Sequence, residues 1–121
     1  MSESATLPRT GHAEVDDAIA RIDGIVNSNP VVLFMKGTPS FPMCGFSARV
    51  SQVLQEVGVP FQAVNVLADG AVREGVKVYG NWPTIPQLYV DGKLVGGCDI
   101  MLDMHRSGEL APLLQGAGAQ S

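Results

Sequence analysis

Cys44 is the residue whose type and surroundings are best suited to chemistry. It lies in the segment Lys36-Gly-Thr-Pro-Ser-Phe-Pro-Met-Cys44-Gly-Phe-Ser47, between a predicted strand and a predicted helix. The unpaired N–H groups and the dipole at a helix start stabilise a thiolate over a thiol. Such a thiolate is both a nucleophile and a soft metal ligand. The alternative, an inert buried cysteine, fits poorly with the Pro- and Gly-rich approach to Cys44.

The other cysteine, Cys98, has two interpretations that the sequence leaves open. It follows Gly96-Gly97 and precedes Asp99, which is expected to cap a helix. Cys98 is therefore either a site residue near a helix start or a small buried filler. Ser47 stands where a thioredoxin-type motif needs a second cysteine, and a hydroxyl cannot resolve a mixed disulfide. Cys44 must use an outside thiol, the distant Cys98, or chemistry other than that of a dithiol.

Three cations are candidates for a ligand site beside Cys44. Lys36 follows a predicted strand, and Arg73 and Lys77 lie four residues apart, on one face of a predicted helix. Together with a thiolate they suit a small anionic thiol with carboxylates, as glutathione is. Solvated surface charge is the alternative interpretation. The aromatic residues Trp82 and Phe46 are interpreted as packing residues in preference to ligand platforms.

Apolar periodicity predicts the elements that position these residues. Helices are expected over 13–28, 45–57, 69–79, 99–107 and 109–114, and strands over 31–35, 61–66, 87–90 and 93–95. The unbroken apolar run 31–35 is typical of a strand covered on both faces. Asp91-Gly92 indicates a hairpin turn, and right-handed crossovers place the second strand parallel to the first. The expected architecture is a small α/β sandwich with a four-stranded mixed sheet.

Composition limits the classes of function. The 121 residues suit one domain, and the net charge of −4 disfavours nonspecific binding to nucleic acid or an anionic membrane. Two cysteines cannot form a secreted disulfide scaffold, and no apolar run is long enough to span a membrane. The sequence predicts a flexible N-terminal arm over 1–12, a domain over 13–115 and a flexible tail over 116–121. The arm lacks the features of a secretory signal, and we expect a cytoplasmic protein.

Three separated motifs resemble those of the monothiol glutaredoxins of the Cys-Gly-Phe-Ser type. They are the segment from Lys36 to Ser47, Trp82-Pro-Thr-Ile-Pro-Gln87, and Val95-Gly-Gly-Cys-Asp-Ile100. The resemblance covers about residues 14–114 and implies a thioredoxin fold, with a four-stranded mixed sheet flanked by about five helices. The chain departs from the family pattern at Val78 and Gly80, where polar residues are expected. This departure concerns the end of a helix and not the site.

The resemblance also implies roles for individual residues. Cys44 would be the redox-active cysteine and the ligand of an iron–sulfur cluster, and the other roles concern glutathione. The glycine carboxylate of glutathione would be held by Lys36 and Arg73, with help from Lys77. The backbone of glutathione would pair with Thr84 and Ile85, which precede a cis Pro86. Its γ-glutamyl end would contact Cys98 and Asp99. The sequence by itself does not establish the cis bond.

The implied function is glutathione-dependent binding and transfer of a [2Fe–2S] cluster, in iron–sulfur assembly and iron homeostasis. Such a cluster needs four thiolates, and this chain offers one suitable cysteine, so two chains and two glutathiones would share it as a homodimer. Expected recipients are apo iron–sulfur proteins, with a BolA-type protein as a further candidate partner. The alternative function is an oxidoreductase that reduces protein–glutathione mixed disulfides through Cys44. The long loop before Cys44 disfavours it by family analogy, so at most weak activity of this kind is expected.

Overall fold

The sheet is built around β1 (Val31–Met35), whose five residues are all buried. In this computed structural model, which describes residues 7–118, the strand order is β2-β1-β3-β4. β1 pairs in parallel with β2 (Gln62–Asn65) and antiparallel with β3 (Gln87–Val90), which pairs antiparallel with β4 (Lys93–Gly96). The predicted four-stranded mixed sheet, with its hairpin and its parallel pair, is confirmed.

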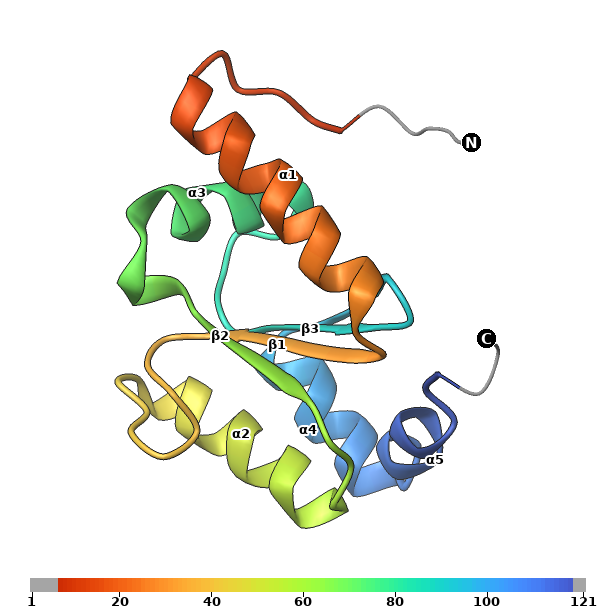
Figure 1. Cartoon of the computed structure of the whole chain (residues 1–121). Coiled ribbons are helices and arrows are strands. Elements are labelled where there is room, and N and C mark those ends of the chain that lie inside the picture. The colour runs from red at the N-terminus through yellow and green to blue at the C-terminus, as the bar shows by residue number, and fades with distance from the viewer. Residues whose placement is uncertain (1–6, 119–121) are drawn as a thin grey trace.

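Helices cover both faces of the sheet (Figure 1). One layer contains α1 (Ala13–Ser28) and α3 (Gly70–Tyr79), and the other contains α2 (Gly45–Val57), α4 (Cys98–Ser107) and α5 (Leu110–Gln115). Successive side chains of a strand point to opposite faces. Val32 and Phe34 therefore pack in the core with α1 and α3, whereas Leu33 packs in the core with α2, α4 and α5. This arrangement explains why β1 is an unbroken apolar run.

Turn residues end the elements as their chemistry predicts. Gly58 and Gly108 end α2 and α4 with φ of 85° and 84°, a conformation that glycine adopts without strain. Asp91 and Gly92 turn the hairpin with φ of 50° and 83°. The sequence did not predict the short 3₁₀ helix η1 (Val66–Ala68), which has too few residues to show a periodicity. This 3₁₀ helix takes residue 66 from the predicted second strand, which also begins one residue later than predicted, at Gln62.

The segments flanking the domain contact it within the described residues. The backbone N–H and the hydroxyl of Thr10 donate hydrogen bonds to Asp16 Oδ1 at 2.8 and 2.9 Å, and Gly118 N–H donates to Asp91 Oδ1 at 2.8 Å. Residues 1–6 and 119–121, which include parts of the predicted arm 1–12 and tail 116–121, lie outside the described residues. None of the helices within 7–118 combines the length and the apolar character needed to cross a membrane.

Candidate functional site

The loop between β1 and α2 is folded tightly on itself. Thr38 N–H donates to Phe41 O at 3.2 Å, Phe41 N–H donates back to Thr38 O at 3.0 Å, and Met43 N–H donates to Lys36 O at 2.9 Å. Gly37 has a φ of 91°, and a Cβ there would lie 2.5 Å from Phe41 O. Only glycine therefore allows the loop to close. The loop returns the chain to the end of β1, where α2 begins.

Cys44 is the N-cap residue of α2, with its side chain at the positive end of the helix. The backbone N–H of Ser47 lowers the pKa of the Cys44 thiol, and the Phe46 N–H, the Lys36 charge and the Ser47 hydroxyl act in the same direction. Burial opposes this effect, but the thiol pKa still falls below its usual value. Cys44 thus lies at a helix start as expected, and its surroundings favour the thiolate over the thiol.

Ser47 has a structural part in the motif. Its side chain is 0% exposed, and its Oγ accepts a hydrogen bond from Lys36 N–H at 3.0 Å. This bond ties the end of β1 to the first turn of α2. Asn65 ties the same region to β2, because its Oδ1 accepts from Gly37 N–H at 2.9 Å.

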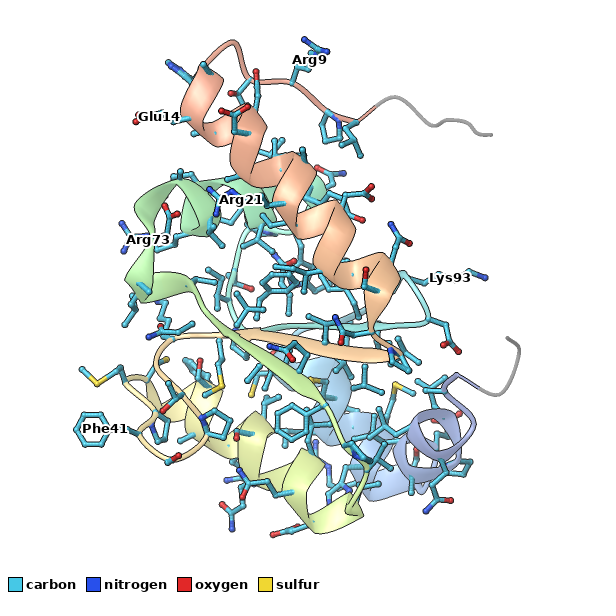
Figure 2. The ribbon with its side chains drawn as sticks, in the orientation of Figure 1. Arg9, Glu14, Arg21, Phe41, Arg73 and Lys93 are labelled. Atoms are coloured by element: carbon cyan, nitrogen blue, oxygen red, sulfur yellow. The ribbon has the colours of Figure 1, made fainter. Side chains whose placement is uncertain are left out.

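A cavity of about 590 Å³ opens beside Cys44. All eight residues that the sequence analysis assigns to the site contribute to its wall: Cys44, Lys36, Arg73, Lys77, Thr84, Ile85, Cys98 and Asp99. They come from the loop after β1, from α3, from the segment before β3 and from the start of α4. Figure 2 shows the Arg73 side chain projecting from α3 on the same side of the molecule as Phe41 of the loop. The structure thus brings together residues that are up to 63 positions apart, from Lys36 to Asp99.

One wall of the cavity carries the three cations. Lys36 is half-buried, and among residues 7–118 its ammonium forms no ion pair. Arg73 and Lys77 both contact the Glu74 carboxylate, with N–O distances of 3.8 and 3.4 Å. An anionic ligand would compete with Glu74 for these two cations. It would not face such competition for Lys36, which forms no ion pair within residues 7–118.

Thr84, Ile85 and Pro86 contribute a short stretch of backbone to the cavity wall. The Ile85–Pro86 peptide bond is cis, as the resemblance implies. Ile85 is buried, yet within the described residues its backbone N–H and carbonyl form no hydrogen bond. Because buried backbone groups are nearly always paired, this edge is suited to pairing with an extended ligand.

The start of α4 forms the third side of the cavity. The predicted cap at Asp99 is wrong: Gly97 is the N-cap, and Asp99 lies in the first turn as an exposed carboxylate without an ion pair among residues 7–118. The helix begins earlier because the Gly97 carbonyl already accepts from Met101 N–H at 3.0 Å. Burial, followed by the Asp99 charge, raises the pKa of the Cys98 thiol. Cys98 lines the cavity, but its thiol loses its proton less readily than that of Cys44.

The two aromatic residues that were interpreted as packing residues differ in their outcome. Phe46 is 63% exposed and lines the cavity, so its interpretation as a packing residue is wrong. Trp82 is half-buried and also lines the cavity, with its indole Nε1 3.0 Å from the place where a Cβ on Gly97 would lie. Their position next to Cys44 and in the Trp-Pro-Thr-Ile-Pro motif was the available signal. The remaining lining residues that were not predicted are Pro83, Pro86, Gly97 and Ile100.

Comparison with known proteins agrees with this geometry. The sequence matches the family model described as Glutaredoxin over residues 31–95, which is more than half of the chain. The chain belongs to the glutaredoxin family. It is 53% identical over 96 residues to a Synechocystis protein named uncharacterized monothiol glutaredoxin ycf64-like, covering 79% of this chain and 90% of the relative. The resemblance to the monothiol glutaredoxins is thus confirmed.

Solved glutaredoxin structures share the fold. A crystal structure of a buckwheat glutaredoxin–glutathione complex superposes with a TM-score of 0.79 at 28% identity, covering 91% of this chain and 98% of the other. The solution structure of a reduced apo glutaredoxin from poplar gives a TM-score of 0.73 at 46% identity, covering 86% and 95%. The four-stranded mixed sheet with five described helices is therefore the thioredoxin fold, as expected.

Proposed function

We propose that this glutaredoxin binds glutathione in the cavity beside Cys44 and, with it, carries a [2Fe–2S] cluster as cargo. The observation that carries the proposal is the layout of the cavity. A backbone edge at Ile85 that is unpaired within residues 7–118 lines the same cavity as a cationic wall and a helix start that bears Asp99. A tripeptide with a carboxylate at one end and an amino-acid head at the other matches that layout. The buckwheat glutaredoxin, which shares the fold and was solved as a complex with glutathione, supports the proposal.

Each part of glutathione has a chemically matched part of the cavity. The glycine carboxylate is attracted by Lys36, Arg73 and Lys77. The peptide groups pair with Ile85, and the γ-glutamyl carboxylate meets free N–H groups at the start of α4, which has no side-chain cap. The γ-glutamyl ammonium pairs with Asp99. This placement leaves the central cysteine of glutathione beside Cys44.

The cluster requires ligands from more than one chain. A [2Fe–2S] cluster with thiolate ligands needs four, and the sequence contains two cysteines. Within residues 7–118 there is no group of three or more His, Cys, Asp or Glu side chains that could hold a metal. Cys44, whose thiol pKa is lowered, is the better ligand of the two. Two Cys44 thiolates and two glutathione thiolates complete the set, which makes the loaded form a homodimer.

The surface around Cys44 supports contact with a second copy. Phe41, Met43 and Phe46 are 72%, 58% and 63% exposed, and they lie within three residues of Cys44 in the sequence. Large apolar side chains that gather on a surface mark interaction sites. Sharing one cluster through Cys44 brings the two copies of this surface close to each other. Burying these side chains adds to the stability of the dimer.

The proposal extends to the fate of the cluster. Because its ligands are accessible thiolates, two of which dissociate with glutathione, the cluster can pass to cysteines of apo iron–sulfur proteins by ligand exchange. A BolA-type protein remains a candidate for the place of the second chain. We place this function in the cytoplasm, where reduced glutathione keeps thiols free.

Two cysteine variants test the proposal. The protein is purified without air, and its iron, sulfide and visible absorption are measured for the wild type, Cys44→Ser and Cys98→Ser. We expect Cys44→Ser to abolish the cluster and Cys98→Ser, the matched control, to retain most of it. Equal loss in both variants would make Cys98 a ligand and overturn the proposed ligand set.

A second candidate function is reduction of mixed disulfides with glutathione. The lowered pKa of the Cys44 thiol favours it, because the thiolate is the attacking species. The same purified protein is assayed for glutathione release from a glutathionylated peptide. Turnover comparable to that of a dithiol glutaredoxin, without cluster binding, would favour this function over cluster transfer.

A further inference from the structure

Two buried polar side chains lie behind the cavity without forming part of its lining. Gln87 is 0% exposed and Tyr89 is 2% exposed, and they point to the same face of β3 because they are two residues apart. The Tyr89 hydroxyl donates a hydrogen bond to Gln87 Oε1 at 2.9 Å. Burying such groups is costly unless their hydrogen bonds are complete, so the pair needs an explanation.

The amide of Gln87 holds the segment that forms the backbone edge. Its Nε2 donates to the carbonyl of Trp82 at 3.1 Å and to the carbonyl of Thr84 at 3.3 Å. A side-chain amide has two N–H donors, and both are used here. Thr84 directly precedes Ile85, whose backbone N–H and carbonyl are unpaired within the described residues. The orientation of the edge is thus fixed from behind by one side chain.

The same pair supports the cationic wall. A Cβ on Gly80 would lie 2.3 Å from Tyr89 Oη and 2.9 Å from Gln87 Oε1, so the residue that follows α3 packs directly on both side chains. Trp82 N–H also donates to the carbonyl of Lys77 at 3.0 Å. Gly80 is one of the two positions where the sequence departs from the family pattern. The φ of Gly80 is −86°, which suits any residue, so backbone conformation does not require glycine here. The lack of space for a side chain explains why glycine stands at this position.

We propose that Gln87 and Tyr89 are positioning residues that fix the spacing between the Thr84–Ile85 edge and the α3 cations. The inference rests on the proposed binding of glutathione in this cavity. A tripeptide that reaches both walls binds well only if their separation is set before it arrives. Gln87 and Tyr89 therefore control glutathione affinity without contacting the ligand.

Calorimetric titration with glutathione tests this inference on the whole chain. We expect Gln87→Met, which keeps the volume but loses all three hydrogen bonds of the amide, to weaken binding about tenfold. Tyr89→Phe keeps the ring and its edge contact with Phe34, so it folds, and we expect about a threefold loss. The control is Leu114→Val, a buried change in α5 on the other side of the sheet, which should leave affinity unchanged.

A rescue experiment separates positioning from general loss of stability. We expect Gly80→Ala to weaken glutathione binding about tenfold, because its new methyl group displaces the Tyr89 hydroxyl. Adding Tyr89→Phe removes that hydroxyl, so the double variant should bind more tightly than Gly80→Ala alone. If the wild type binds glutathione and Gln87→Met binds it with the same affinity, this inference alone is overturned. Additive losses of affinity in the double variant would overturn it as well. A wild-type chain that does not bind glutathione overturns the proposed function as well.

Discussion

Replacing Ser47 with alanine should lower stability and leave the acidity of Cys44 largely intact. The Ser47 hydroxyl accepts the Lys36 N–H at 3.0 Å in a fully buried position. Its loss leaves that N–H unpaired, at a cost of about 1–3 kcal/mol out of a total stability of about 5–15 kcal/mol. The main cause of the lowered Cys44 thiol pKa is the backbone N–H of residue 47, which alanine retains.

The assay combines urea unfolding with a pH titration of thiolate absorbance in the Cys98→Ser background. A loss of about 2 kcal/mol should lower the urea midpoint by about 1 M. Ser51→Ala is the matched control: Ser51 is also buried in α2, but its hydroxyl accepts from the exposed Gln55 side chain, which can turn to water. A Ser47→Ala protein with an unchanged midpoint, or with a Cys44 pKa back at its ordinary value, would refute this reasoning.

Three further predictions concern charge and thiol reactivity around the cavity. Lys36→Glu turns an attraction of about 1 kcal/mol into a similar repulsion, so glutathione binding measured by calorimetry should weaken roughly thirtyfold, and less at high salt. Glu74→Gln removes the carboxylate that contacts the two α3 cations, so binding should strengthen about two- to fivefold. Alkylation by iodoacetamide, followed by mass spectrometry, should reach half its maximal rate at a lower pH for Cys44 than for Cys98.

Each of these predictions has a clear opposing result. Unchanged affinity in Lys36→Glu, with a native circular dichroism spectrum, would remove Lys36 from the site. Weaker binding in Glu74→Gln would mean that this carboxylate orders the cations instead of competing for them. Equal alkylation profiles for the two cysteines would contradict the helix-start account of Cys44.

Sequence patterns contained within one short segment predicted the elements of the fold well. The apolar run 31–35 indicated a strand covered on both faces, and Asp91-Gly92 indicated the hairpin turn; both are confirmed. Cys44 was placed at the start of a helix from its neighbours alone, and it is the N-cap. These features are local, so neighbouring residue types determine them.

Features that depend on how the backbone turns and where side chains point were missed. Nothing in the sequence around Gln87 shows that its amide binds the carbonyls of Trp82 and Thr84. The cap of α4 was misplaced because Asp99 is a good capping residue, whereas the backbone turn at Gly97 decides the helix start. The ion pairs of Glu74 were also missed, although Arg73 is adjacent to it and Lys77 lies three residues further along the same helix.

Native mass spectrometry of protein reconstituted without air, with and without glutathione, tests the central claim most directly. The account predicts one species that contains two chains, two glutathiones and one [2Fe–2S] cluster, and a cluster-free monomer when glutathione is removed. A cluster that stays on a single chain in the absence of glutathione would contradict the account.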